Sequence, residues 1–164
     1  MSTTELRDVM RNFATGVCVA TTYSDGPDGR LDDAITINSL TSVSVDPPLV
    51  SMCLRHDSGF LANVREVGCW ALSILDAGTE DIARALAKDR ESRSVAMRTL
   101  SAWRGESTGA LVLDSPSWLE CKLSDMVAVG DHMMLIGEVV GLGTQERRPP
   151  LIFLQGGFHT LSGA

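Results

Sequence analysis

Short apolar runs separated by polar turns recur along most of this chain. Runs rich in β-branched and apolar residues are typical of strands. The predicted strands cover residues 16–23, 31–37, 49–54, 69–75, 117–126, 132–143 and 151–158. Between the first two, the segment SDGPDGR (residues 24–30) brings Gly, Pro and Asp together, which predicts a turn and therefore a hairpin.

Apolar residues recur at helical spacing in three short segments. Apolar residues near the start of the chain fall on one helical face and predict an amphipathic helix over residues 4–14. Further helices are predicted over residues 60–67 and 79–88, whereas the polar residues 89–108 show no clear period. Strands dominate and follow one another through short loops, so the pattern favours a mainly β fold, an antiparallel barrel with a few peripheral helices. A doubly wound sheet would need regular strand–helix alternation.

The polar segment TINSLTSVSVDPP (residues 36–48) interrupts this pattern. Five hydroxyl side chains and Asn38 fall within nine residues, between two predicted strands. Such a segment is either a polar loop whose side chains satisfy their own backbone, or a cradle for a ligand with many hydrogen-bonding groups. Composition alone favours the polar loop.

Two further segments carry candidate chemistry. In RHDSGF (residues 55–60), Ser58 stands at or near the start of a predicted helix, where it serves as an N-cap, as part of a phosphate site, or as both. In the triplet Gly-Asp-His (residues 130–132), His132 stands at the mouth of a predicted strand. It is either an incidental member of a turn or a side chain that faces a ligand.

Composition narrows the class of protein. A chain of 164 residues with 44% apolar residues predicts a single domain over residues 1–164 with a proper core. Its four cysteines lie in apolar runs without C-x-x-C spacing, which indicates free thiols in a reducing compartment. No export signal is evident at the start, and no apolar run approaches the length of a membrane helix. We therefore expect a cytoplasmic protein that does not bind membranes.

Charge and histidine spacing narrow the ligand classes. The net charge is -7, and the chain contains no basic run, which disfavours nucleic-acid binding because phosphate neutralisation needs a basic face. The three histidines lack short metal-ligand spacing, so no metal site is expected. An anionic ligand would have to be held by local backbone amides and a few arginines.

Two segments together resemble a known family. AITINSLTSVSVDPPLVSMCL resembles the flavin-binding segment of the flavin reductase-like family, commonly G-x-T-x-N/S-S-F-x-S-V-S-x-x-P-P-L-V, and GDHMMLIGEV resembles that family's G-D-H-x-x-x-x-G-E-V. The resemblance extends over roughly residues 5–162. It implies a split antiparallel β-barrel that forms a homodimer and binds FMN or FAD at the dimer interface. It also implies reduction of flavin by NADH or NADPH, with the free reduced flavin reaching a separate monooxygenase by diffusion.

The resemblance also implies roles for individual residues. His132 would be the catalytic residue that faces the nicotinamide, with Asp131 either orienting the imidazole or capping the turn. Phe158 would close over the flavin ring. The other flavin-binding residues would be Thr36, Ile37, Asn38 and Ser39 around the ring, and Cys53, Leu54, Arg55 and Ser58 along the ribityl and phosphate side.

Several positions depart from the family pattern. Ala34 stands in place of a common glycine, Leu40 in place of a phenylalanine, and Phe60 in place of a threonine that would offer a hydroxyl to phosphate. The residues before Phe158 lack a common arginine or lysine. Fewer anion contacts predict weak nucleotide binding, which suits a reductase that releases flavin. The alternatives are a flavin-binding protein without significant turnover, and a structural dimer that has lost the flavin site.

Overall fold

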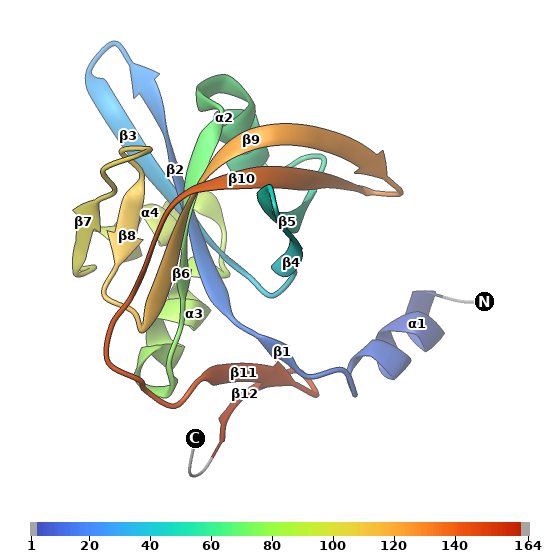
Figure 1. The fold of residues 1–164 in the computed structure, drawn as a ribbon. Coiled ribbons are helices and arrows are strands. Elements are labelled where there is room, and N and C mark those ends of the chain that lie inside the picture. Colours follow the sequence, from blue (N-terminus) through green and yellow to red (C-terminus); the bar gives the residue numbers. More distant parts are fainter. Residues whose placement is uncertain (1–2, 162–164) are drawn as a thin grey trace.

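A seven-stranded antiparallel sheet forms the centre of the molecule, in the order β3-β2-β6-β9-β10-β5-β4 (Figure 1). The structure is a computed structural model and describes residues 3–161. The strands of this sheet are β2 (Cys18–Gly26), β3 (Gly29–Ile37), β4 (Thr41–Val45), β5 (Pro48–Arg55), β6 (Cys69–Ile74), β9 (Ser117–Val129) and β10 (His132–Thr144). The prediction of a mainly β, antiparallel fold is confirmed.

Two small sheets complete the β structure. One joins β1 (Thr15–Gly16), β11 (Leu151–Leu154) and β12 (Gly157–Thr160), and the other pairs β7 (Ala102–Arg104) with β8 (Leu111–Leu113). The single strand predicted over residues 151–158 is wrong, because the chain turns back at Gln155 and Gly156. Both residues have positive φ angles, 53° and 80°, which end one strand and start the next.

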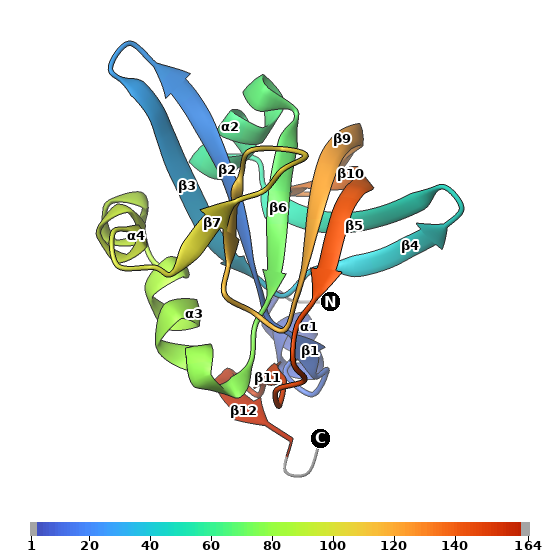
Figure 2. The ribbon, with the colours of Figure 1, turned by 60° about the vertical axis from the view of Figure 1, so that its left-hand side comes forward.

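The helices are short and peripheral, as predicted. They are α1 (Thr3–Met10), α2 (Gly59–Val67), α3 (Glu80–Leu86) and α4 (Arg90–Met97), with a 3-10 turn η1 (Ala77–Thr79) before α3. Figure 2 shows α3 and α4 on the side of the sheet where β2 and β3 lie. Helix α1 ends earlier than the predicted residue 14, and α4 with β7 occupies the stretch in which the sequence showed no period.

Two strand boundaries also differ from the prediction. The turn predicted over residues 24–30 shrinks to two residues, because Gly26 already pairs with Gly29. The polar segment 36–48 is not all loop, since β4 lies within it and pairs with β5. Strand β4 is an edge strand with exposed residues, so it lacks the apolar alternation of a half-buried strand.

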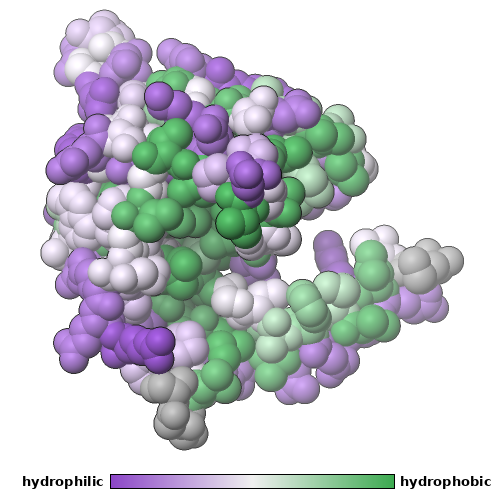
Figure 3. Space-filling view, in the orientation of Figure 1, coloured by the Kyte–Doolittle hydropathy of each residue, from purple (hydrophilic) through white to green (hydrophobic). Residues whose placement is uncertain are grey.

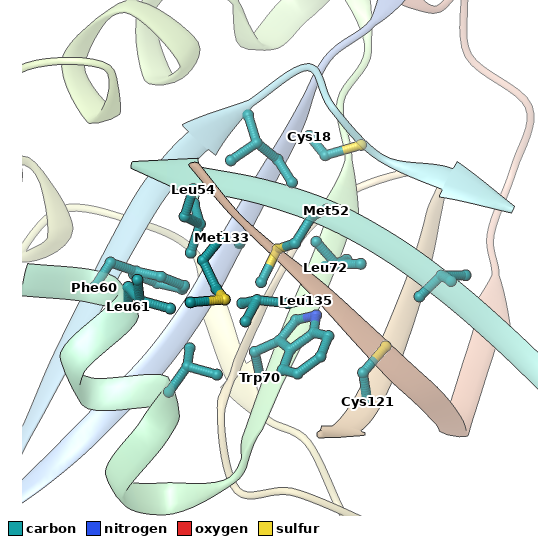
Figure 4. Close-up of a cluster of buried hydrophobic side chains, with 14 residues drawn as sticks. Cys18, Met52, Leu54, Phe60, Leu61, Trp70, Leu72, Cys121, Met133 and Leu135 are labelled. Atoms are coloured by element: carbon teal, nitrogen blue, oxygen red, sulfur yellow. The ribbon is translucent and has the colours of Figure 1, made fainter. Parts of the chain in front are cut away.

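The main core fills the space between α2 and the inner face of the sheet (Figure 4). Trp70 and Phe60 are fully buried there and pack among Met52, Leu61, Leu72 and Leu135. Each such side chain contributes about 1.5–3 kcal/mol through burial. A second cluster, which includes Val19, Leu86 and Leu151, packs α3 against the face of the sheet opposite to α2. These two cores pack the strands whose ends build the candidate site.

Candidate functional site

Three segments that are distant in the sequence meet around one cavity of about 390 Å³. They are the end of β3 with the following loop, the end of β5 with the loop to α2, and the start of β10. The antiparallel register of β5 and β10 places His132 opposite Arg55 and Met134 opposite Cys53. The cavity is lined by Ile35, Thr36, Ile37, Asn38, Ser39, Cys53, Leu54, Arg55, Asp57, Ser58 and His132.

Ser39 joins the first segment to the second. Its hydroxyl accepts a hydrogen bond from the Cys53 N–H (3.0 Å) and donates one to the Cys53 carbonyl (3.2 Å). Strand β4 pairs with β5 only as far as Ser51, so beyond that point the Ser39 hydroxyl satisfies the backbone edge of β5. This polar side chain therefore serves its neighbouring backbone, as the polar-loop interpretation proposed for the whole segment.

The other members of the polar segment are arranged differently. The Thr36 hydroxyl donates to the Ala83 carbonyl of α3 (2.8 Å), and Ile37 is buried in the core. Asn38 is exposed, and its side-chain amide has no hydrogen-bond partner within residues 3–161. Asn38 is therefore the side chain of this segment that is available to a ligand in the cavity.

The loop after β5 forms the polar end of the cavity. Ser58 occupies the N-cap position of α2 with extended backbone (φ -70°, ψ 123°), but its side chain makes no capping hydrogen bond. The predicted N-cap is thus correct in position, and its hydroxyl is not engaged with the helix. Phe60 is fully buried in the core, so no ligand-facing group replaces the hydroxyl that its position commonly supplies in the resembled family.

Arg55 is paired within this loop. Its Nε and Nη2 atoms donate to the two carboxylate oxygens of Asp57, each at 3.0 Å. The guanidinium holds the pKa of the Asp57 carboxyl below its usual value through these hydrogen bonds. Both side chains are largely exposed, so the pair contributes little to stability. Its importance is that Asp57, which the sequence analysis did not select, stands among the residues of the cavity.

His132 lies at the rim of the cavity and is held by its neighbour. The Nδ1 atom of His132 is 2.8 Å from Oδ1 of Asp131, and this contact lowers the pKa of the Asp131 carboxyl. The turn that carries both residues is tied to the β5 loop through His56, whose backbone N–H donates to the Asp131 carbonyl (3.3 Å). The contact favours the orienting role for Asp131. Because Nδ1 is engaged with Asp131, Nε2 is the ring nitrogen of His132 that is available to a ligand.

Phe158 is the one predicted site residue that does not line this cavity. It belongs to β12 and lines a neighbouring cavity of about 170 Å³, which shares Thr36, Ile37 and Asn38 with the first. Its ring packs edge-on against Phe153 with centroids 5.5 Å apart. Arg84 of α3 lies over the same ring, 4.9 Å from its centroid, and was not identified from the sequence because only the fold brings α3 to β12.

Two further cavities connect this region with the N-terminal arm. One, of about 390 Å³, lies between α1 and the turn of the β11–β12 hairpin, and another, of about 670 Å³, lies between Phe13 and the loop after β3. Both share Asn38 with the first cavity. Figure 3 shows the hollow between the projecting arm and the rest of the molecule, with apolar surface along it. The candidate site is thus an open groove on this chain.

The arrangement suits a planar ligand with polar edges and an anionic tail. Apolar residues line the cavity together with an amide, hydroxyl groups, a guanidinium, a carboxylate and an imidazole. Within residues 3–161, no cluster of three or more His, Cys, Asp or Glu side chains is arranged to hold a metal ion. No helix in the same range is long and apolar enough to cross a membrane.

Comparison with known proteins gives a consistent result. A family model described as flavin reductase like domain matches residues 10–162. The chain is 34% identical over 157 residues to an NADH-dependent FAD reductase of Streptomyces globisporus, covering 94% of this chain and 84% of that protein. It is 33% identical over 156 residues to a probable flavin reductase of Rhizobium meliloti (strain 1021), covering 94% of this chain. The chain spans only about half (48%) of the length of that second relative.

A solved structure has the same fold. The crystal structure of BorF, the flavin reductase component of a bacterial two-component tryptophan halogenase, superimposes with a TM-score of 0.88 at 32% identity. The match covers 98% of each chain.

Proposed function

Because the chain belongs to the flavin reductase like domain family, we propose that it reduces free FMN or FAD with NADH or NADPH and supplies the reduced flavin to a separate monooxygenase. The observation that carries the proposal is the cavity in which nine of the ten predicted site residues meet, with Phe158 in the adjoining one. A bound flavin supplies a ring that accepts a hydride directly from a nicotinamide. The protein then has to position the two rings and supply the electrostatic environment.

The residues of the cavity fit such a ligand. The Asn38 amide offers both a donor and an acceptor to the polar edge of a flavin ring. In this proposal the partly buried Ile35 contacts the ring, and Ser58 and Arg55 are assigned to the ribityl and phosphate end. A volume of about 390 Å³ lies in the range of small-molecule sites.

His132 is the residue to which we assign nicotinamide positioning. With Nδ1 held by Asp131, the imidazole has a fixed orientation, and Nε2 remains for a hydrogen bond to the carboxamide or the pyrophosphate of NADH. Such a contact keeps the two rings face to face without moving a proton. Misplacement of reacting groups by about 1 Å costs on the order of a hundredfold in rate.

Weak flavin binding fits the delivery of a diffusible product. Phe60 is buried, and Arg84, the cation that lies over the Phe158 ring, is also paired with Glu80 at 2.6 Å. All four cysteines are unpaired, which supports a reducing, cytoplasmic environment.

We further propose that the protein is a homodimer and that the second copy closes the groove. Helix α1 buries none of its residues, yet it carries Leu6, Val9 and Met10, and Phe13 follows it, all well exposed. Contiguous apolar patches of this kind mark interaction surfaces. Because the cavities along α1 also involve Asn38, a partner seated on α1 would complete the walls of the flavin site.

Light scattering tests the dimer with two matched variants. Val9→Glu places a charge on the apolar face, whereas Gln145→Glu adds the same charge at a polar, exposed position on the loop after β10. We expect the wild type and Gln145→Glu to be dimers at micromolar concentration and Val9→Glu to dissociate. A wild-type monomer would contradict the proposal.

A visible spectrum and an NADH oxidation assay test the activity. We expect the purified protein to be nearly colourless and to oxidise NADH or NADPH only when free flavin is added. A yellow protein without NADH oxidation would indicate a flavin-binding protein instead. A colourless and inert protein would indicate a structural dimer without a functional flavin site.

A further inference from the structure

Two arginines of α1 line the cavity of about 390 Å³ between this helix and the turn of the β11–β12 hairpin. Arg7 and Arg11 are one helical turn apart, so their side chains lie on the same flank of α1, next to Met10 of the apolar face. The backbone N–H of Gln155 donates to the Arg11 carbonyl (2.9 Å), which ties the end of the arm to the hairpin. The two arginines therefore border a space that the fold defines.

The positive charge of this cavity is not neutralised by its other walls. Its lining residues within the described part of the chain include no Asp or Glu, and residues 155–157 of the hairpin carry no charge. The Arg7 side chain has no hydrogen bond or ion pair within residues 3–161, and Arg11 reaches only Asp8, at 4.0 Å between two exposed side chains. Such an exposed pair is weak. In a chain of net charge -7, two cations without a carboxylate in the same cavity favour an anionic ligand.

The position of this cavity indicates which anion it receives. It shares only Asn38 with the flavin cavity, and we assign the Asn38 amide to the polar edge of the flavin ring. Arg55 and Ser58, which we assign to the phosphate end of the flavin, line the flavin cavity and not this one. A ligand between α1 and the hairpin therefore approaches the flavin at its ring end. The hydride donor has to reach the flavin there.

NADH and NADPH carry their negative charge at a distance from the ring that reacts. Both contain a pyrophosphate with a negative charge on each phosphate group, and NADPH has a further phosphate on its adenosine ribose. We propose that Arg7 and Arg11 bind the phosphates of the nicotinamide dinucleotide and so hold its reduced ring beside the flavin. The planar guanidinium suits this role because its N–H groups can bind two phosphate oxygens at once. This inference rests on the flavin reductase function proposed above.

Steady-state oxidation of NADH at saturating flavin tests this role. Arg7→Gln and Arg11→Gln remove the charge and keep a polar side chain, and α1 buries none of its residues, so the melting temperature should not change. We expect KM for NADH to rise about three- to tenfold in each variant, while kcat changes by less than about twofold. Added salt should raise the KM of the wild type more than that of the double variant, because exposed charges are screened.

Further measurements exclude other causes of a raised KM. Arg7→Lys combined with Arg11→Lys keeps both charges and should retain most of the affinity for NADH. Arg65→Gln removes an exposed arginine from the last turn of α2, outside this cavity, and should leave KM unchanged. ADP-ribose contains the pyrophosphate but no nicotinamide. It should compete with NADH, and its inhibition constant should rise in the Gln variants by about the same factor as KM.

The outcomes separate this inference from the proposed function. An unchanged KM for NADH in the double Gln variant, or no inhibition of the wild type by ADP-ribose, would overturn the inference. It would also be overturned if the FAD dissociation constant, measured by fluorescence quenching, rose as much as KM, or if light scattering showed that the rise in KM accompanies a change in oligomeric state. In each case the wild type would still reduce flavin with NADH. A wild type without that activity would instead refute the proposed function.

Discussion

Asn38 lines four cavities that meet around it, and its amide has no partner within the described residues 3–161. We therefore expect Asn38→Leu to weaken flavin binding with little change in the melting temperature. Mispairing the polar edge of the ring would cost about 1–3 kcal/mol of binding free energy. Gln145→Leu, which makes the same chemical change on an exposed loop, should leave flavin affinity unchanged. Equal affinities for both variants by flavin titration would show that residue 38 belongs only to a polar loop.

His132 is expected to act on the nicotinamide rather than on the flavin. His132→Ala should lower the maximal rate of flavin reduction by about tenfold to a hundredfold and change the flavin dissociation constant much less. Asp131→Asn should lower the rate less, because the imidazole stays in place but loses the carboxylate that orients it. His159→Ala removes an imidazole outside the flavin cavity and serves as the control. A normal rate and a normal dependence on NADH in folded His132→Ala would refute the role.

At the scale of elements, the junction of β3 and β5 depends on one hydroxyl. Ser39→Ala removes both hydrogen bonds to Cys53 and leaves the partly buried edge of β5 unsatisfied. We expect a loss of about 1–3 kcal/mol in unfolding free energy, together with weaker flavin binding. Ser39→Thr keeps the hydroxyl and should retain more of both properties, and Ser42→Ala, at an exposed position of β4, should change neither. Urea unfolding and flavin titration of the three variants test this prediction. A Ser39→Ala variant with the unfolding free energy and the flavin affinity of the wild type would contradict it.

Comparing the predicted with the observed elements shows which of them are specified by the local sequence. The strands of the central sheet could be predicted, because β-branched and apolar runs between turn residues specify them without tertiary contacts. Helix α4 could not, since it is short and is held by a buried ion pair between Arg93 and Asp33, 60 residues apart. The turn at Gln155 has a local signal in Gly156-Gly157, which the prediction of one strand over residues 151–158 did not take into account.

Some residues of the candidate site could likewise be predicted from the sequence, and others could not. Nine predicted residues line one cavity because they come from contiguous motifs on neighbouring strands. Asp57 lies within one of these motifs but was passed over, since an aspartate beside a helix start is typical of a cap. Arg84 reaches Phe158 only through the folding of α3 against β12, and nothing in the sequence around either residue indicates the contact.

At the scale of the whole molecule, the buried thiols make stability depend on alkaline pH. Burial raises the pKa of Cys18 and of Cys121 from 9.0 to about 12. In the unfolded chain both thiols ionise near pH 9, so between pH 9 and about 12 the unfolded state loses protons that the folded state keeps. The unfolding free energy is therefore unaffected by these thiols below pH 9 and falls as the pH rises, with a limiting slope of about 1.4 kcal/mol per pH unit for each thiol.

Urea unfolding at a series of pH values from about 8 to about 11 measures this slope. Cys18→Ala should be less stable at neutral pH, because it leaves a cavity in the core, but its alkaline decline should be shallower. Cys53→Ala, which changes a half-buried thiol, is the matched control for the loss of a cysteine. A wild-type stability that stays constant above pH 9 would contradict the prediction.

The central claim is that the groove around Asn38 and His132 brings a flavin and a nicotinamide together for direct hydride transfer. The most direct test is anaerobic stopped-flow mixing of the protein and flavin with NADH, with and without deuterium at C4 of the nicotinamide. The account predicts that the protein accelerates bleaching of the flavin and that deuterium slows the accelerated phase. Bleaching no faster than in the absence of protein would contradict it.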